Sequence, residues 1–491
     1  MIFYRGAKSA TSLTQSINSS TNNTADTSPQ SSESVLSPTI FPTFSFVGTS
    51  LTTNNTDSGS KPTISPTRLN DTTSFLDDPI LDMELLDTLS SPYTMNHFLQ
   101  GDDADSLYGF STAVSADMSV LAVGATNALD ESGNHAGAVF LYSIDSSDAA
   151  AFPTLAQVLY GSSAESEFGN GVALSDDGNR LVVAARSENV QEGAIRVYER
   201  ASGTKEWMLS GTIVGEGEGF RAGWSVAISG DGNVVAMGST KGGSNQGGIV
   251  STYIAPDWIL HGSIIEAKTS KDVTGFSVSL NGDGKVIAVG SVKATNPERM
   301  SNAGRVDVYA MDGTSWNAEF EVFGDSRQGY DGSSVALSSD GSLLVVGGRG
   351  FTSEGSAEVG RCRIFERSGT GQYELLHTTV GKNKGEELGW SVAISADGNK
   401  VACGGQGGKM LDLGESGVVR GGSGVVRVWD RVSLQDSEVL PRGERLSTVE
   451  GSSFGSSVSL SSDGSSLVVG ASTWAGGDAS SSGGIFSFSL S

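Results

Sequence analysis

A block of 17 residues recurs seven times between residues 109 and 471 and sets the pattern of apolar and polar positions. In the copy Gly223–Ser239, bulky and small side chains first alternate, and a nearly unbroken apolar run follows. Alternation with period 2 is typical of a strand, and a short apolar run is typical of a strand buried on both faces. An Asp-Gly pair separates the two halves, and glycine tolerates the positive φ of a tight hairpin turn. The first block is the exception, because Met118 replaces this glycine. Each block therefore predicts a β-hairpin.

The copies follow one another at nearly constant spacing, which predicts a repeat protein. A third strand beginning with glycine follows each hairpin, as in Gly193–Tyr198, and a weaker fourth strand precedes the next block, as in Trp207–Val214. Four antiparallel strands in each of seven units predict an all-β fold, a seven-bladed β-propeller. The turn aspartates that mark the units are Asp117, Asp177, Asp231, Asp283, Asp340, Asp397 and Asp463. Turn chemistry accounts for all of them, so we expect a structural role and not a catalytic or metal-binding one.

The two ends of the repeat region complement each other. The seventh unit has its third strand at 484–490 and no fourth strand after it. Residues 93–100 precede the first block in the way that fourth strands precede the other blocks. We therefore expect this N-terminal strand to complete the seventh blade and leave no open seam, so that the propeller spans residues 93–491.

The N-terminal region has the opposite character. Ser and Thr fill 31 of the 67 positions from 9 to 75, with five prolines and no apolar periodicity. Such a segment buries too little apolar surface to offset its ordering entropy, so residues 1–75 are predicted to be a disordered tail. Its Asn-x-Ser/Thr motifs indicate either an N-glycosylated stalk or chance in a sequence of this composition. These motifs begin at Asn18, Asn22, Asn54 and Asn70.

Residues 76–92 link the tail to the propeller and mix acidic side chains with leucine and isoleucine. The pattern fits a short amphipathic helix after Pro79. Such a segment either docks on its own domain, which we favour, or binds a partner.

The composition argues against several classes of partner and site, namely nucleic acid, a membrane span, a disulfide framework and a metal motif. The 31 Lys and Arg against 56 Asp and Glu give a formal charge of −25, which argues against nucleic acid as a main partner. No run reaches the roughly 18 apolar residues of a membrane span, and no signal peptide is readable at the start. The two cysteines, Cys362 and Cys403, occupy positions of small core residues and cannot form a disulfide framework. The four histidines are far apart, so no metal motif is readable.

Two motifs give a family resemblance. Phe454-Gly-Ser-Ser-Val-Ser-Leu, followed by Leu467-Val-Val-Gly-Ala, resembles the FG-GAP repeat, which builds the propeller of integrin α-subunits and of many surface proteins. The resemblance implies the same fold over the whole repeat region. The calcium loop of integrin-type repeats is reduced here to Ser-x-Asp-Gly, which cannot supply the six to eight oxygens that calcium needs. Val428-Trp-Asp resembles the WD repeat, but the histidine network of that family cannot recur with four histidines.

The sequence carries no readable catalytic motif. It has no Gly-x-Ser-x-Gly, phosphate-binding loop or His-Glu-x-x-His, so we expect no catalytic residue, no cofactor and no metal site. Variable loops on a rigid scaffold usually carry binding, and the loops that lead into the first strands are acidic. They form a candidate binding rim, or simply a solvated acidic surface, made of Asp102, Asp103, Asp105, Glu165, Glu167, Glu216, Glu218, Glu386 and Glu387.

These observations together predict a monomeric, non-enzymatic binding or scaffold propeller that contacts a protein or carbohydrate. We expect it to be secreted or at the cell surface, with the cytoplasm as the alternative location. The alternative function is an enzyme or lectin with its site at the mouth of the central channel. Convergent carboxylates and aromatic side chains at the axis would favour that alternative.

Overall fold

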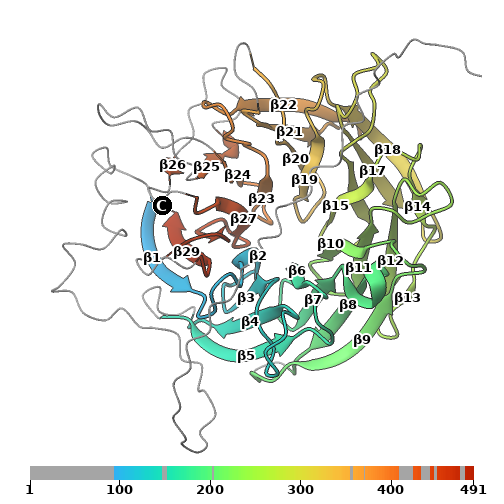
Figure 1. Ribbon diagram of the computed structural model, residues 1–491. Helices are drawn as coiled ribbons and strands as arrows, with labels where there is room; N and C mark the ends of the chain where they lie inside the picture. Colours follow the sequence, from blue (N-terminus) through green and yellow to red (C-terminus); the bar gives the residue numbers. More distant parts are fainter. Residues whose placement is uncertain are drawn as a thin grey trace, which may run out of the picture. The chain divides into compact units, whose positions relative to one another are not determined.

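The computed structural model describes residues 93–145, 152–201, 204–353, 358–369, 371–407, 424–432, 443–446, 451–475 and 481–490. The predicted tail, the predicted linker and the four Asn-x-Ser/Thr motifs lie outside these residues. The described strands form seven antiparallel sheets, arranged as the blades of a propeller (Figure 1). The predicted fold is therefore confirmed.

The first three blades follow the predicted order of strands. Blade 1 contains β2 (Tyr108–Val114), β3 (Val120–Ala125), β4 (Ala138–Ser143) and β5 (Thr154–Tyr160). Blade 2 contains β6 (Phe168–Leu174), β7 (Arg180–Ala185), the short α1 (Glu188–Gln191), β8 (Ala194–Glu199) and β9 (Met208–Val214). Blade 3 contains β10 (Ala222–Ile228), β11 (Val234–Ser239) and β12 (Ile249–Ile254), and its outer strand is split into β13 (Ile259–Leu260) and β14 (Ile265–Glu266).

The other four blades complete the ring. Blade 4 contains β15 (Thr274–Leu280), β16 (Val286–Ser291), β17 (Arg305–Met311) and β18 (Trp316–Phe323). Blade 5 contains β19 (Asp331–Leu337), β20 (Leu343–Gly348), β21 (Arg361–Arg367) and β22 (Tyr373–Val380). Blade 6 contains β23 (Ser391–Ile394), β24 (Lys400–Gly405), β25 (Val425–Asp430) and β26 (Gly443–Leu446). Blade 7 contains β27 (Phe454–Leu460), β28 (Ser466–Ala471), β29 (Gly484–Leu490) and β1 (Tyr93–Gln100).

The seventh blade joins the two ends of the repeat region. β1 pairs with β29 in antiparallel register, from Tyr93 opposite Leu490 to Gln100 opposite Gly484. This pairing confirms the predicted closure by the N-terminal strand. The ring has no open seam between its first and last blades, so neither β27–β29 nor blade 1 presents an incomplete sheet.

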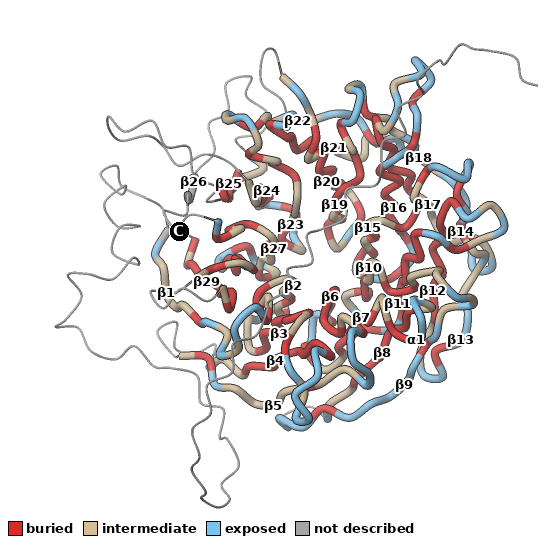
Figure 2. The backbone as a smooth tube through the Cα atoms, viewed as in Figure 1, coloured by how far each residue is buried: buried red, intermediate tan, exposed pale blue. Residues whose placement is uncertain are grey.

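The core lies within and between neighbouring blades. The second strands β3, β11, β16 and β20 are buried along their whole length, as the apolar runs predict. Figure 2 shows this burial on the inner strands, while the exposed residues concentrate on loops and outer strands. Apolar clusters cross from blade to blade: Val120 of blade 1, for example, belongs to the same cluster as Phe168 and Leu181 of blade 2. No helix in the described part of the chain has the length and apolar character to span a membrane.

Two rings of hydrogen bonds connect all seven blades. In the first ring, a side chain of each first strand donates to the carbonyl of a glycine in the next blade, over 2.8 to 3.0 Å. The donors are Ser111, Asn170, Ser225, Ser277, Ser334, Ser391 and Ser457. In the second ring, backbone N–H groups next to the Asp-Gly turns donate to carbonyls of the neighbouring turn over 2.8 to 3.4 Å. Each blade is thus fixed to both neighbours at two levels.

The two cysteines differ from the sequence-based interpretation in one respect. Cys362 on β21 and Cys403 on β24 are fully buried, as expected of small core residues. They are also joined by a disulfide, with their Cα atoms 6.7 Å apart. The residues are separated by 41 positions in sequence, and only the packing of blade 5 against blade 6 brings them together. The prediction of two buried core residues is therefore confirmed, whereas the disulfide between them was not predicted.

Candidate functional site

The propeller has two different ends. At the loop end, the loops between second and third strands contact the loops that lead into first strands, through bonds such as Asn127 N–H to the Ser106 carbonyl. These two sets of loops therefore share one face of the propeller. The turn end, at the other ends of the same strands, carries the Asp-Gly turns.

At the turn end, the repeated carboxylates are already used by their own turns. Asp340 accepts hydrogen bonds from the Ser338 hydroxyl at 2.7 Å and from the Ser342 N–H at 2.8 Å. Burial raises the pKa of the Asp340 carboxyl, but these hydrogen bonds outweigh it, so the pKa is lowered. The other six turn aspartates have the same balance and also a lowered pKa. Their geometry is that of a structural turn.

The predicted acidic rim residues lie at the loop end, on blades 1, 2, 3 and 6, but the structure does not gather them into one site. Asp102, Asp105, Glu165, Glu216 and Glu218 are exposed, whereas Asp103, Glu167 and Glu387 are half-buried. Glu165, Glu167 and Glu218 line one surface hollow of 840 Å³ beside α1.

Glu386 is the exception among the predicted rim residues, because only 2% of its side chain is exposed. Its carboxylate lies 2.6 Å from the guanidinium of Arg427 on β25, which is equally buried. It also accepts hydrogen bonds from the N–H groups of Lys382 and Asn383, both at 2.9 Å. Glu386 therefore belongs to the internal framework of blade 6 and is not part of an exposed rim.

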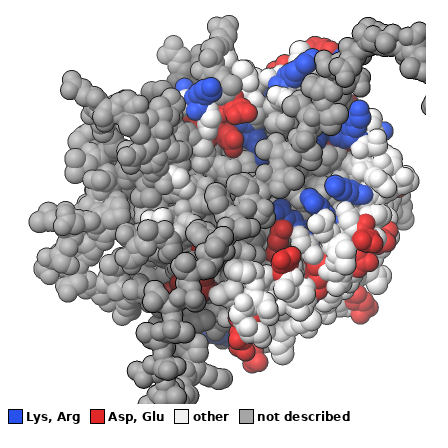
Figure 3. All heavy atoms as spheres, in the orientation of Figure 1, with Lys and Arg blue, Asp and Glu red and all other residues white. Residues whose placement is uncertain are grey.

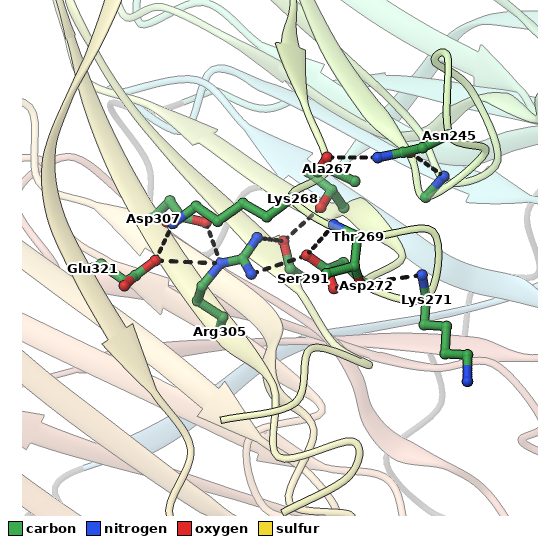
Figure 4. A network of polar contacts seen from close by, with 12 residues as sticks. Asn245, Ala267, Lys268, Thr269, Lys271, Asp272, Ser291, Arg305, Asp307 and Glu321 are labelled. Carbon is green, nitrogen blue, oxygen red and sulfur yellow. Dashed lines mark hydrogen bonds and ion pairs between the residues drawn. The ribbon is translucent and has the colours of Figure 1, made fainter. Parts of the chain in front are cut away.

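Similar buried ion pairs support the loop end of other blades. In Figure 4, Arg305 on β17 lies between Asp272 and Asp307, with nitrogen–oxygen distances of 2.9 and 2.6 Å. In blade 5, Asp331 accepts from Arg361 at 2.5 Å and from Arg363 at 2.7 Å. Sequence reasoning passed over these third-strand arginines, although their repeated position was readable. They connect the third strands to the loops that lead into the first strands.

At the loop end, arginine and aromatic side chains form a continuous row of contacts across five consecutive blades. Arg186 of blade 2 lies 4.5 Å above the ring of Trp224 in blade 3, and that ring lies 5.4 Å from Phe276 in blade 4. Arg349 of blade 5 lies 5.5 Å from Phe276 and 4.4 Å from Trp390 in blade 6. We call these five residues the Arg–aromatic arc. In the view of Figure 3, Lys and Arg side chains gather beside the middle of the ring, with Asp and Glu next to them.

The sequence explains this arrangement. The second residue of the repeated block is aromatic in blades 1, 3, 4 and 6 and is Ser456 in blade 7, but it is Asn170 in blade 2 and Ser333 in blade 5. Those two blades have arginine directly after the second strand, and the backbone N–H of each arginine donates to the Asn170 or Ser333 side chain. Each arginine thus passes over a small residue of its own blade and reaches the tryptophan of the next. Aligning the blocks shows the residue types at these positions, but the contacts between blades come only from the structure.

The two arginines of the arc have different surroundings. Arg186 forms an ion pair with Glu167, which also accepts a hydrogen bond from the Ser187 hydroxyl at 3.0 Å. In blade 5, Tyr330 occupies the position of Glu167, with nearly the same φ of 53° against 54°. Burial lowers the pKa of Arg349, and Glu387 is the carboxylate that acts most strongly on it. Burial raises the pKa of Glu387, although Arg349 and a hydrogen bond with Gln406 oppose the shift.

At the loop end, carboxylates and aromatic rings thus lie near one another at two separate places, around Arg186 with Glu167 and around Arg349 with Glu387. Among the described residues, no group of three or more His, Cys, Asp or Glu is placed to hold a metal ion. In comparisons with known proteins, the sequence matches no family model and no curated protein. The functional interpretation therefore depends on the geometry of the loop end.

Proposed function

We propose that this protein is a non-enzymatic binding propeller of the FG-GAP type, and that its loop end contacts a protein or carbohydrate ligand. The Arg–aromatic arc carries this proposal. The same backbone supports seven nearly identical turns at the other end, whereas here the side chains at equivalent positions differ from blade to blade. Half-buried aromatic rings beside a few charged groups are typical of binding sites.

The disulfide supports a place outside the cell, because disulfides persist in oxidising compartments and are rare in the cytosol. Cys362 and Cys403 form one between blades 5 and 6, the same two blades that the contact of Arg349 with Trp390 connects. The Ser/Thr-rich tail is consistent with a stalk for such a protein. A monomer that does not bind nucleic acid remains our expectation, in line with the formal charge of −25.

A lectin is the second candidate, because aromatic rings and carboxylates share the loop end. A glycoside hydrolase is less favoured, because such enzymes need one proton-donating and one free carboxyl group flanking the bond. Glu167 is already neutralised by Arg186 and hydrogen-bonded to Ser187. This arrangement suits a group that positions an arginine better than one that transfers a proton.

Binding of the full-length chain to immobilised glycans and to cell-surface proteins tests the proposal. The variant Trp224→Ala/Trp390→Ala removes two rings of the arc, and Leu375→Ala, which changes a 56% exposed residue on an outer strand, serves as the control. We expect the double variant to lose at least about 10-fold in affinity, since interface aromatic residues are often binding hot spots, and the control to stay within about 2-fold. If the double variant binds its ligand as tightly as the control and the unchanged chain do, the proposal is contradicted. Release of sugar from the glycans would favour an enzyme instead.

A further inference from the structure

Arg349 is a half-buried cation without a polar partner for its guanidinium. Three aromatic rings surround it, with centroids 4.4 Å (Trp390), 5.5 Å (Phe276) and 5.7 Å (Tyr330) from the guanidinium carbon. Within the part of the chain that the structure describes, no ion pair or hydrogen bond of the Arg349 guanidinium is present. Its only hydrogen bond there is from its backbone N–H to the Ser333 hydroxyl.

The other buried and half-buried arginines of the described residues show how unusual this is. Each one has a side-chain or backbone oxygen within hydrogen-bond distance of its guanidinium, for example Glu188 at 2.6 Å from Arg196 and Gln191 at 3.3 Å from Arg221. Arg186 is the closest match, because it also stacks on a tryptophan and follows a second strand, yet it has Glu167 as its partner. A half-buried guanidinium that lacks such an oxygen has unused donors, which an anion from outside can accept.

We propose that Arg349 binds the carboxylate of an acidic sugar, which rests on the binding function proposed above. The planar guanidinium presents two parallel N–H donors that match the two oxygens of a carboxylate. The half-buried rings of Trp390 and Phe276 next to it offer apolar faces for the C–H groups of a sugar ring. The sugar would thus be held by its charge at Arg349 and by its ring at the aromatic side chains.

The surrounding charge favours a singly charged group over a phosphate. Glu387 acts electrostatically on Arg349 without forming an ion pair with it, and the whole chain carries a formal charge of −25. Repulsion from these groups grows with the charge of the ligand. A phosphate carries about −1.5 to −2 at neutral pH, so it is repelled more strongly than a carboxylate.

The surrounding polar groups favour a sugar over the carboxyl terminus of a peptide. A peptide needs hydrogen-bond partners for its backbone as well as for its carboxylate. The nearby hydroxyl groups of Ser277, Ser334 and Ser391 already donate to glycine carbonyls of the next blade, at 2.8 to 2.9 Å. Aromatic faces are therefore the main feature that this part of the loop end offers beside the charge.

Titration of the full-length chain with sodium glucuronate, followed by tryptophan fluorescence and by NMR of the indole N–H groups, tests this inference. Glucose is the neutral counterpart, and N-acetylglycine mimics a peptide carboxyl terminus. We expect glucuronate to bind at least about 10-fold more tightly than either probe, because a charge-assisted bidentate contact adds to ring packing. Arg349→Met should weaken glucuronate binding by about 10- to 100-fold.

Two further variants make the outcome decisive. Arg349→Lys keeps the charge but loses the planar fork, so it should bind glucuronate with intermediate affinity, and it decides the question if Arg349→Met does not fold. Arg180→Met changes another half-buried arginine that lies over a tryptophan, Trp258, but has Glu199 as its partner and lies at the turn end, so it should leave the affinity within about 2-fold.

The inference is overturned if glucuronate binds no better than glucose, if N-acetylglycine binds as tightly, or if the Arg349 variants bind like the unchanged chain. If the Trp224→Ala/Trp390→Ala variant then still loses a ligand on the immobilised glycans or proteins, the proposed binding function stands and only the carboxylate subsite fails. If no ligand responds to either set of variants, the proposed function fails as well.

Discussion

The two ends of the propeller use the same backbone for opposite purposes. At the turn end, seven aspartates accept hydrogen bonds within their own turns, so repetition there reflects a structural requirement. At the loop end, the residue three positions before the second residue of each repeated block has a φ between 51° and 57° in every blade. Its side chain differs from blade to blade and includes leucine, arginine and tyrosine. A constant backbone with varied side chains is what a binding surface on a rigid scaffold requires.

The largest expected effect is on stability, and it tests whether a buried ion pair supports the loop end. Glu386→Ala leaves the buried Arg427 without its carboxylate, so it should lower the free energy of unfolding by about 3–5 kcal/mol. Urea unfolding followed by circular dichroism measures this loss. Glu218→Ala, which removes an exposed glutamate from the corresponding loop of blade 3, should change stability by no more than about 0.5 kcal/mol. Equal effects of the two substitutions would show that Glu386 is an ordinary rim residue.

The next effect concerns the covalent connection between blades 5 and 6. Replacing both Cys362 and Cys403 by alanine should cost about 2–4 kcal/mol, because the bond restricts the unfolded chain. Thermal unfolding of both proteins under non-reducing conditions gives the difference. Thiol titration of the denatured, unreduced chain is the direct check, and two reactive thiols there would show that the disulfide does not form.

A smaller effect is expected at the turn end. Asp340→Ala removes the acceptor for the Ser338 hydroxyl and the Ser342 N–H, so it should lower the free energy of unfolding by about 1–2 kcal/mol at pH 7. Ser338→Ala is the matched partner, and the double variant should lose less than the sum of the two single variants. Chemical denaturation of the four proteins measures both quantities.

The contribution of Asp340 should depend on pH in a defined direction. Its pKa is lowered in the folded protein, so its stabilising effect is present above the unfolded value of about 3.9 and is lost as the pH falls through the folded pKa. The difference between the unchanged protein and Asp340→Ala should therefore shrink below about pH 4. A difference that grows on acidification would contradict the hydrogen-bonded carboxylate.

The smallest expected effect is that of calcium at the turn end. Each turn supplies one carboxylate, already engaged in hydrogen bonds, whereas calcium needs six to eight oxygens. Calorimetric titration at physiological ionic strength should show no stoichiometric binding at these turns. Any affinity should be weak and salt-dependent and should come from the exposed acidic loops. Tight binding that Asp463→Ala abolishes would show that the turns are metal sites.

Most of the fold could be predicted because each blade is encoded locally. The alternation and apolar run of each block specify two strands without any knowledge of the rest of the chain. Blade 3 differs from the prediction only at its edge, where β13 and β14 replace one outer strand. That edge depends on tertiary packing, with Trp258 donating its indole N–H to Ser210 of the neighbouring blade.

The site was less predictable because its contacts join different blades. Trp224 and Trp390 stand in the repeated block and were visible there, but nothing in the local sequence indicates that Arg186 and Arg349 lie over them. Glu386 had the same limitation, because its partner Arg427 follows 41 residues later and an acidic loop residue is usually exposed. The place of a residue within its blade can be predicted from the periodicity of the sequence. Contacts between side chains of different blades can be identified only once the blades are arranged in the ring.

The pairing of β1 with β29 also sets the order of events during synthesis. β1 can pair with β29 only after Leu490, the partner of Tyr93, has left the ribosome. Until then the nascent chain has one free strand at its beginning and an unfinished sheet at its growing end, each with unpaired backbone groups that can capture other chains. Because this contact spans nearly the whole repeat region, its closure is expected to be the slow step of folding. A chain that is truncated before β29 would therefore keep unpaired strand edges and would tend to aggregate.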